Sequence, residues 1–388
     1  MLKNNTDHLT KGVAEIIPID QFNEQLSSNR PLKLKFGADP SRPDIHLGHV
    51  VLLKILRRFQ DAGHGVQFII GDFTAKIGDP TGKNKTRPAL TDAEILANAT
   101  SYQDQVFKIL DRQKTTVYYN SEWLNTVKPN QFISLLSQVT IQQLLARDDF
   151  SKRHSQQVPI YLHECIYPIL QAYDSVHLES DIEFGGTDQK FNLLLGREFQ
   201  RVARLSPQSI VLMPILEGLD GIQKMSKSLD NYIGINEEPK EIFGKLMSIS
   251  DDLMVRYFEI LSDQVFNTDE HPMTAKKNLA QEITGLLTTS KEAQVARQAF
   301  EKQFSDRAIP TDIPQVTIKR LPSNKINLVD GIVQSNVISS KNEVRRLLKQ
   351  SAIKMNGKKQ CDELVSIENE FVILQIGKRK FIQINVEN

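Results

Sequence analysis

Two short stretches of this 388-residue chain contain residue types that could act on a phosphate ester. His46-Leu47-Gly48-His49 places two imidazoles three residues apart, so on a helix they would share a face, and the glycine would let a flat ligand approach the backbone. Lys224-Met225-Ser226-Lys227-Ser228 places two lysines among small hydroxyl side chains, where they could neutralise the charge of a departing pyrophosphate. Each stretch has a plain alternative, a pair of surface histidines or a solvated basic loop. Together, each after a predicted strand, they favour a nucleotide-binding site.

Three further polar residues predict a pocket for a small zwitterion. Tyr167, Gln171 and Asp174 are spaced i, i+4 and i+7, so they would share one face of a helix. A phenol, an amide and a carboxylate that project into one pocket would suit a polar amino acid with a hydroxyl group at its far end. The alternative is the polar face of an ordinary helix, and the residues alone leave both interpretations open.

The elements around these residues predict an α/β fold. Residues 32–37 and 66–70 resemble buried strands, and helical spacing between residues 44 and 62 predicts the helix that joins them. Such a βαβ unit implies a parallel sheet. The pattern returns later as a strand at 182–184, a tight turn at Gly185-Gly186, a helix capped by Thr187 that runs to about 201, and a strand at 210–216.

Changes of pattern along the chain divide it into predicted domains. These are a Rossmann-like catalytic domain over 1–235 with a mostly helical insertion at about 120–174, an α-helical domain over 236–305, a proline-marked linker over 306–325 and a small α+β unit over 326–388. Within the last unit we expect a helix at 341–350 and strands at 371–376 and 380–386, hinged at Gly377.

Composition excludes several classes of protein. Lys+Arg 48 against Asp+Glu 47 leaves a net charge of +1, which excludes a uniformly basic nucleic-acid binder but permits a local basic patch. The chain has only two cysteines and no CxxC pattern, which argues against a disulfide scaffold and against a zinc site built from cysteines. We therefore predict no bound metal. The first residues lack the apolar region of a signal peptide, and no apolar run is long enough to cross a bilayer. We therefore expect a cytoplasmic protein without membrane contact.

The two motifs resemble the HIGH and KMSKS signatures of class I aminoacyl-tRNA synthetases, with Leu47 in place of isoleucine. The stretches GADPSRPDIHLGH, IGDFTAKIGDPTGK, YPILQAYD, FGGTDQKFN and KMSKSLDN are similar to the bacterial tyrosyl-tRNA synthetase family. The resemblance covers essentially the whole chain, because the C-terminal unit is similar to the S4 RNA-binding domain. It implies a tyrosine–tRNA ligase, which activates L-tyrosine with ATP to tyrosyl-adenylate and pyrophosphate and then transfers the tyrosyl group to the 3′ end of tRNA(Tyr).

The resemblance also implies roles for the matching residues. Asp174 would bind the substrate phenol. The amino end of tyrosine would be bound by Tyr167, Gln171, Gln189, Asp39 and Asp79. ATP would be bound by His46, Gly48, His49, Lys224 and Lys227, with Gly186 and Asp188 at its ribose. The catalytic groups would be His46, His49, Lys83, Arg87, Lys224 and Lys227.

Two positions depart from simple patterns. Residues 78–83 are not a P-loop, because the glycine spacing is one residue short and Asn84 follows the lysine, so the resemblance places Lys83 and Arg87 on a second mobile loop instead. Lys35 stands where the smaller bacterial tyrosine enzymes have a tyrosine that shares the phenol contact. The second contact to the phenol is therefore open.

A basic segment in the C-terminal unit predicts the RNA-binding surface. Between Lys341 and Gln360 seven basic residues stand against one acid. The predicted phosphate contacts are Lys341, Arg345, Arg346 and Lys349, with a solvated charged helix as the alternative. The resemblance favours RNA binding and implies Mg²⁺ that arrives with ATP. It also implies a homodimer formed through the helical insertion. The α-helical domain would lie on the anticodon side of the bound tRNA.

Three other functions remain possible from sequence. A tryptophanyl-tRNA synthetase shares the architecture, but a carboxylate at Asp174 favours a phenol over an indole. A catalytically idle RNA-binding paralogue would keep the fold, but such relatives usually lose the lysine loop, which is intact here. A small-molecule nucleotidylyltransferase also uses an HxGH motif, but it has no reason to carry the helical and S4-like C-terminal units.

Overall fold

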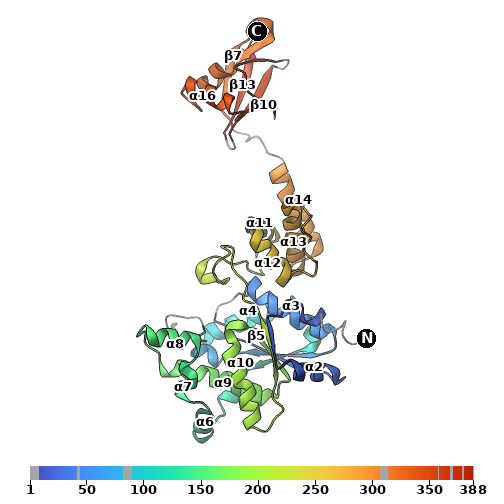
Figure 1. Ribbon diagram of the computed structural model, residues 1–388, viewed down its shortest axis with the longest axis vertical. Helices are drawn as coiled ribbons and strands as arrows, with labels where there is room; N and C mark the ends of the chain where they lie inside the picture. The colour runs from blue at the N-terminus through green and yellow to red at the C-terminus, as the bar shows by residue number, and fades with distance from the viewer. Residues whose placement is uncertain are drawn as a thin grey trace. The chain divides into compact units, whose positions relative to one another are not determined.

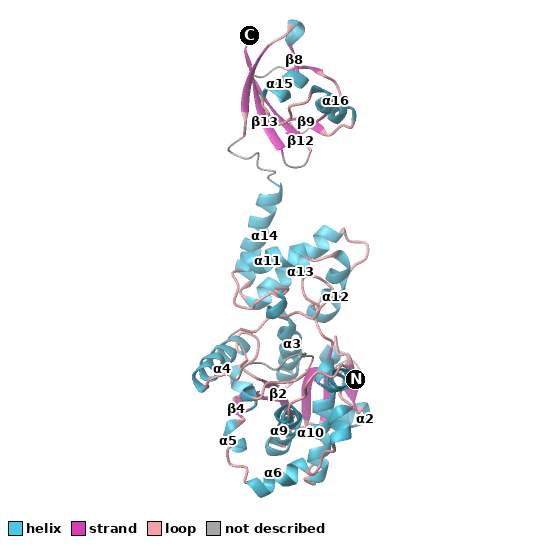
Figure 2. Cartoon of the chain, turned by 90° about the vertical axis from the view of Figure 1, so that its left-hand side faces the viewer, coloured by secondary structure: helices cyan, strands magenta, loops and turns pink. Residues whose placement is uncertain are grey.

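A computed structural model of the chain describes residues 8–41, 44–81, 90–305, 313–356, 358–367, 370–377 and 380–387. The chain divides into two compact units, Met1–Gln298 and Ala299–Asn388. Figure 1 and Figure 2 show the elements of each unit. The predicted boundary at residue 235 lies inside the first unit and stays a prediction. No described helix has the length and apolar character that a membrane crossing requires.

A six-stranded sheet forms the centre of the first unit, in the order β1-β6-β5-β2-β3-β4. The strands are β1 Glu15–Ile17, β2 Lys33–Ala38, β3 Gly65–Ile70, β4 Thr115–Tyr119, β5 Ile182–Gly186 and β6 Ser209–Met213. All neighbouring strands pair in parallel except β1, which runs antiparallel to β6 at the edge. The predicted α/β fold with a parallel sheet is confirmed.

The strand order reverses at the centre of this sheet, next to β2. From β2 the chain continues to β3 on one side, whereas β5 lies on the other side of β2. The helices that follow these strands are α3 Leu47–Asp61 after β2 and α10 Lys190–Val202 after β5. Helix α3 packs against β3 and β5, and α10 packs against β5 and β6. In open parallel sheets a crevice forms at such a reversal, outside the carboxyl ends of the strands.

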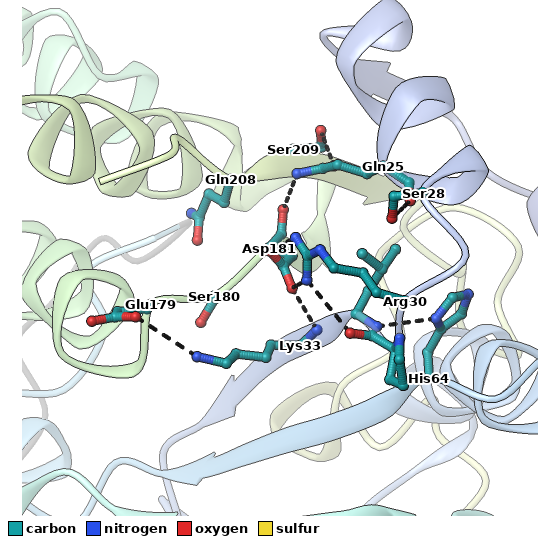
Figure 3. Close-up of polar contacts among 12 residues, drawn as sticks. Gln25, Ser28, Arg30, Lys33, His64, Glu179, Ser180, Asp181, Gln208 and Ser209 are labelled. Carbon is teal, nitrogen blue, oxygen red and sulfur yellow. Dashed lines mark hydrogen bonds and ion pairs between the residues drawn. The ribbon is translucent and has the colours of Figure 1, made fainter. Parts of the chain in front are cut away.

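Polar contacts lock the opposite edge of the sheet. Figure 3 shows Asp181 between the amino ends of β2, β5 and β6. Its carboxylate accepts a hydrogen bond of 2.8 Å from the backbone N–H of Lys33 and pairs with both terminal nitrogens of Arg30, at 2.9 and 2.6 Å. Its backbone oxygen accepts from the N–H of Ser209 at 2.8 Å and from the amide of Gln25 at 3.0 Å. One residue therefore ties three strands and the preceding helix α2 Ile19–Ser27 together, away from the ligand edge.

The predicted insertion is helical, as expected. It contains α5 Ser121–Leu124, α6 Pro129–Leu136, α7 Ile141–Leu145, α8 Asp148–Ser155 and α9 Leu162–Leu178. The last helix runs four residues beyond the expected end at 174 and packs along α10. Helix α4 Asp92–Val106 precedes β4, the outer strand on this side of the sheet.

Local predictions around the second half of the sheet need correction. Gly185 and Gly186 do not form a tight turn but are the end of β5, where they pair with β6. A Cβ atom on Gly185 would lie 3.1 Å from the Leu193 side chain, so this glycine permits close packing of α10 on the strand. Thr187 does not cap that helix; it begins a 3-10 turn, and the N-cap is Gln189. Strand β6 ends at Met213 because Pro214 has no N–H to donate.

The region predicted as an α-helical domain over 236–305 contains α11 Pro239–Ser248, α12 Asp251–Leu261, α13 Pro272–Leu287 and α14 Ser290–Ser305. The boundary between the two units falls within α14, so a separate domain over 236–305 stays a prediction. Helix α3 is anchored to this region through charge. Lys54 pairs with Asp263 at 2.9 Å, and Arg58 pairs with the other oxygen of the same carboxylate at 2.8 Å. The helix that begins at the histidine motif is therefore held at its far end by the segment after α12.

The second unit has its own small core of aliphatic side chains. A five-stranded sheet runs in the order β10-β9-β12-β13-β7, with β7 Gln315–Lys319, β9 Ile353–Met355, β10 Lys358–Gln360, β12 Phe371–Ile376 and β13 Lys380–Glu387. The remaining elements are β8 Lys325–Asn327 paired with β11 Leu364–Ser366, and the helices α15 Leu328–Gln334 and α16 Lys341–Lys349.

The second unit contains the predicted helix and strands, and also strands that were not predicted. The predicted helix at 341–350 and both predicted strands are present, and Gly377 between the strands has φ +63°, a conformation that favours glycine. The predicted linker over 306–325 stays a prediction, but its residues 315–319 are part of the folded unit. These residues form β7, which pairs in parallel with β13 and so closes the sheet. Residues 306–312 lie outside the described residues.

Candidate active site

A cavity of about 720 Å³ opens at the carboxyl ends of the central strands. Residues from β2, β3, β5 and β6, from α9 and from the lysine loop contribute to its wall. The wall includes these predicted site residues: Asp39, His46, Gly48, His49, Asp79, Tyr167, Gln171, Asp174, Gly186, Asp188, Gln189, Lys224 and Lys227. The structure therefore brings together residues from four distant stretches of sequence. Lys83 and Arg87 lie outside the described residues.

The histidine pair is held at the start of α3 as two neutral hydrogen-bond donors. His46 is the N-cap residue, and its Nδ1 accepts a hydrogen bond of 3.2 Å from the N–H of Gly48. The Nδ1 of His49 accepts from the backbone N–H of His46 at 3.4 Å. Because both Nδ1 atoms accept, the ring hydrogen of each neutral histidine resides on Nε2. Burial, followed by the neighbouring His49 and the two loop lysines, lowers the pKa of His46 to about 2. Burial, with the charge of Lys227, lowers the pKa of His49 to about 4.

The segment after the lysine loop braces this motif. The N–H of Leu47 donates to the carbonyl oxygen of Ile233 at 2.9 Å, and the N–H of Ile235 donates to that of Ile45 at 3.2 Å. A Cβ atom on Gly48 would lie 3.0 Å from two ring atoms of His46, so a larger residue here would displace the histidine. The two motifs are thus parts of one local structure.

Each lysine of the loop has a carboxylate partner. The ammonium nitrogen of Lys224 lies 3.5 Å from Oδ2 of Asp188. Lys227 pairs with Asp44, two residues before the histidine motif, and its nitrogen lies 5.4 Å from the ring centroid of Tyr232. These ion pairs hold both positive charges at the edge of the cavity, where an anionic ligand could replace the carboxylates.

The loop itself is shaped by one asparagine. Oδ1 of Asn231 accepts from the N–H of Ser226 at 2.8 Å, while its Nδ2 donates to Asp220 at 3.0 Å. Gly218 permits this arrangement, because a Cβ atom there would lie only 2.2 Å from Nδ2 of Asn231. Sequence inspection singled out the lysines but missed the side chain that organises their loop.

The predicted trio shares one face of α9, and all three residues reach the cavity. Asp174 is only 4% exposed, and its carboxylate accepts from Nε1 of Trp123 at 2.8 Å and from Nδ2 of Asn120 at 3.4 Å. Burial raises the pKa of Asp174 to about 7. Burial, with the nearby carboxylates of Asp39 and Asp79, also raises the pKa of the Tyr167 phenol. The pocket therefore ends in a buried acid with one protein donor on each oxygen, which leaves lone pairs for a further donor.

The raised pKa of Asp174 predicts a pH dependence of stability. In the unfolded chain an aspartate titrates near 3.8, so from about pH 4 to about pH 7 the folded protein retains a proton that the unfolded chain has lost. The contribution of Asp174 to the free energy of unfolding therefore falls as pH rises through this interval. An Asp174→Asn variant lacks this contribution. We expect its stability relative to the original protein to rise with pH, by at most about 1.4 kcal/mol per pH unit.

Urea unfolding of both proteins between pH 5 and 7.5 tests this expectation. The difference between the two proteins isolates Asp174 from the other titrating groups. A difference that stays constant over this range would show that Asp174 is ionised throughout.

The ammonium group of Lys35 is occupied by buried protein partners. The side chain is 1% exposed, and its nitrogen lies 2.9 Å from Oε1 of Glu183, 2.6 Å from Oγ of Ser175 and 3.0 Å from the backbone oxygen of Gln171. An ammonium group has three N–H donors, and these three partners use them all. Glu183, which sequence inspection missed, is thus the charge partner that allows a lysine beneath the pocket.

At the other end of the cavity the amide side chains form a chain of hydrogen bonds. Nε2 of Gln189 donates to Oδ2 of Asp79 at 2.7 Å, and Thr74 donates to Asp39 at 2.7 Å. Asn192, also missed by sequence inspection, donates to the side-chain oxygens of Gln171 and Gln189 at 2.9 and 3.0 Å. Gln171, Gln189 and Asp79, three of the residues predicted for the amino group, therefore belong to one network.

The basic residues of the second unit lie on α16, but three have acidic neighbours. Lys341 pairs with Asp330 at 2.8 Å and Arg345 with Glu363 at 2.9 Å. Arg346 lies 3.8 Å from Glu343 on the same helix, and Lys349 is exposed. Exposed pairs of this kind are weak, so phosphates could displace the acids. Among the described residues, no group of three or more His, Cys, Asp or Glu side chains could hold a metal ion.

Comparisons with known proteins agree with this geometry. The family model for tRNA synthetases class I (W and Y) matches residues 27–305, and that for the tyrosine–tRNA ligase SYY-like C-terminal domain matches residues 303–384. The tyrosine–tRNA ligase of Geobacter metallireducens is 48% identical, and that of Aquifex aeolicus 47% identical, each over 97% of both chains. Among solved structures, a C-terminally truncated mitochondrial tyrosyl-tRNA synthetase of Aspergillus nidulans has a TM-score of 0.65 at 20% identity, over 77% of this chain and 94% of that one, and so shares the fold.

Proposed function

The chain belongs to the class I aminoacyl-tRNA synthetases and is a tyrosine–tRNA ligase, and we propose that the cavity at the carboxyl ends of the sheet is its active site. The observation that carries this proposal is the meeting, in one cavity, of the two histidines, the two loop lysines and the buried acid of α9. The enzyme uses ATP to activate L-tyrosine and joins it to tRNA.

In the first step the carboxylate of tyrosine attacks the α-phosphorus of ATP, and pyrophosphate leaves. The substrate supplies the nucleophile, so the protein contributes position and charge. His46 and His49, neutral and with Nε2–H free to donate, suit contacts to phosphate oxygens. Lys224 and Lys227 exchange their carboxylate partners for the phosphates that leave. We assign Lys83 and Arg87 to the same task on the resemblance alone.

The amino-acid pocket recognises tyrosine at both ends. Asp174 accepts the phenol hydrogen, held in place by Trp123 and Asn120. The α-ammonium group is bound by Tyr167, Gln171, Gln189, Asp39 and Asp79, which line the same cavity. Gly186 and Asp188 take the ATP ribose. The acid alone does not choose between tyrosine and tryptophan, because an indole N–H can also donate to a carboxylate, as that of Trp123 does to Asp174. The likeness to tyrosine–tRNA ligases over nearly the whole chain supports tyrosine.

In the second step a ribose hydroxyl at the 3′ end of tRNA(Tyr) takes the tyrosyl group. The basic face of α16, with Lys341, Arg345, Arg346 and Lys349, provides contacts to RNA phosphates in this proposal. Mg²⁺ enters with ATP as part of that substrate. A cytoplasmic location follows from the proposal, since the ribosome consumes the charged tRNA there.

A homodimer formed through the helical insertion is part of the proposal. Large apolar side chains are exposed on its helices, with Ile141 69% and Leu162 78% exposed, and Ile133 and Tyr161 also open to solvent. Several such side chains on one insertion are typical of a protein–protein interface. We expect a dimeric mass at micromolar concentration by sedimentation.

Charge placed on this surface should break the dimer. An Ile141→Asp, Leu162→Asp double variant is expected to sediment as a monomer, whereas Val265→Asp, a change at an equally exposed apolar residue outside the insertion, should stay dimeric. A monomeric mass for the unaltered protein would contradict the proposal.

Exchange of labelled pyrophosphate into ATP tests the assigned chemistry. Each of the twenty amino acids is offered separately, without tRNA. We expect exchange with tyrosine alone. Exchange with tryptophan would show that the assignment of Asp174 is wrong, and absence of exchange from folded protein would contradict the assignment of the cavity as the site of activation.

A further inference from the structure

A second layer of residues lies behind the proposed ammonium site. Asn192 on α10 is 1% exposed and does not itself line the cavity. Its Nδ2 donates to Oε1 of Gln171 at 2.9 Å and to Oε1 of Gln189 at 3.0 Å. The nitrogens of these two glutamines point to carboxylates, Gln171 to Glu183 at 3.3 Å and Gln189 to Asp79 at 2.7 Å. Asn192 is thus shared by the two amide side chains of the ammonium site.

Arg147 holds Asn192 from the side of the helical insertion. Its guanidinium group is buried, and Nη1 donates to Oδ1 of Asn192 at 2.9 Å. Nη2 donates to Thr81 at 3.2 Å, and two contacts of 3.1 and 3.2 Å to the carboxylate of Asp149 complete its pairing. The carbon of the guanidinium group lies 4.8 Å from the ring centroid of Phe150. A buried arginine with this many partners has one orientation.

Arg147 at one end of this hydrogen-bonded chain and two carboxylates at the other determine the orientation of the three amide groups between them. An arginine can only donate hydrogen bonds, so the oxygen of Asn192 must face it and the nitrogen must face the glutamines. An ionised carboxylate can only accept, so the glutamine nitrogens must face Glu183 and Asp79. Lys35, at 2.9 Å from Glu183, compensates the charge of one of these carboxylates. Only one orientation of the three amides satisfies all of these partners.

We propose that Arg147 and Asn192 are positioning residues that hold the side-chain oxygens of Gln171 and Gln189 ready to accept hydrogen bonds from the α-ammonium group of tyrosine. The inference rests on the proposed function, in which both glutamines bind that group. Each amide oxygen has two lone pairs, and Asn192 uses one. A glutamine that rotates by half a turn would present N–H groups to the ammonium and repel it. Neither Arg147 nor Asn192 lines the cavity, so both would act through the glutamines.

The test compares two ligands that differ only in the amino group. L-tyrosine and 3-(4-hydroxyphenyl)propanoate, which lacks that group, are bound to the full-length protein in equilibrium dialysis. The variant is Asn192→Leu, which keeps the shape of the side chain and leaves Arg147 its contacts to Asp149 and Thr81. We expect the dissociation constant of tyrosine to rise about tenfold or more, and that of the deaminated ligand to change by less than about twofold.

A second variant and a control guard against a purely structural effect. Arg147→Met removes the donor that orients Asn192 and is expected to show the same ligand-selective loss, of smaller size. Gln67→Leu removes a buried amide that contacts Ser180 and the backbone of Leu178, away from the cavity, and should leave both ligands unaffected. Urea unfolding shows which variants are folded, and either of the first two suffices for the comparison.

The outcomes separate the inference from the function on which it rests. An equal loss for both ligands, or no loss for tyrosine, in folded Asn192→Leu or Arg147→Met protein would overturn the positioning role. If the unaltered protein binds the two ligands equally well, the ammonium site itself is wrongly assigned, and the inference is overturned together with that assignment.

Discussion

Lys227→Ala is expected to slow the formation of tyrosyl-adenylate by about a hundredfold or more, while the dissociation constant of tyrosine stays within about twofold. Lys227 lies at the edge of the cavity beside Asp44, far along the chain from the residues of the amino-acid pocket. A positive charge that meets the leaving phosphates is needed only as their negative charge develops, so its loss reduces the rate and not the binding of tyrosine. Single-turnover rates of adenylate formation and equilibrium binding of tyrosine separate the two quantities.

Two further variants show whether the effect belongs to the charge of Lys227. Lys240→Ala removes an exposed lysine of α11 that does not line the cavity, and should leave the rate unchanged. Asp44→Asn removes the partner of Lys227 but leaves the lysine, so the loss of rate should be less than about tenfold. A large loss of tyrosine binding in Lys227→Ala would contradict the assigned role.

Asp174→Asn is expected to lower kcat/KM for tyrosine by about a hundredfold, with little change for phenylalanine. The carboxylate is buried and already accepts from Trp123 and Asn120, so it is shaped to accept one more hydrogen bond. An amide of the same size presents N–H groups at one of these positions and leaves a donor without an acceptor. Phenylalanine has no hydroxyl group, so it makes no contact that the substitution could remove.

Activation of both amino acids, followed by pyrophosphate exchange, measures this selectivity. Asp181→Asn is the matched control, because it replaces an acid that is also hydrogen-bonded but lies at the amino ends of the strands. It should leave selectivity intact. Equal losses for tyrosine and phenylalanine in Asp174→Asn would mean that Asp174 maintains the pocket and does not read the phenol.

Much of the fold near the site follows from local sequence patterns. The strand expected at 66–70 is β3 Gly65–Ile70, and the helix expected between residues 44 and 62 is α3 Leu47–Asp61. These elements are predictable because continuous apolar runs and helical spacing are strong signals. Strand β7 was hidden because its neighbours are prolines and its pairing partner β13 lies some seventy residues away. The short antiparallel edge strand β1 was missed for a similar reason, since its partner β6 is distant in sequence.

The site was predictable where a motif or a helical spacing marks it, and not where partners come from distant elements. The histidine motif, the lysine loop and the face of α9 all meet in one cavity. Trp123, Asn120 and Glu183 lie in stretches with no distinctive spacing, and only packing brings them to Asp174 and Lys35. For Lys35 the sequence raised the question of a missing phenol contact. The structure places the lysine in a buried ion pair, which sequence could not show because its partner Glu183 comes from the distant strand β5.

The carboxylate partners of the loop lysines bear on how the enzyme releases pyrophosphate. Lys224 and Lys227 are paired with Asp188 and Asp44 in the structure without nucleotide, so in the proposed mechanism the triphosphate replaces one anion by another. The lysines therefore add less to the affinity of the enzyme for ATP than unpaired lysines would. When pyrophosphate leaves, the ion pairs between the lysines and the carboxylates form again. Asp188 is also the proposed ribose contact. When its carboxylate binds the ribose, it releases Lys224, so the two changes are coupled. Such an exchange favours rapid turnover over tight retention of the nucleotide.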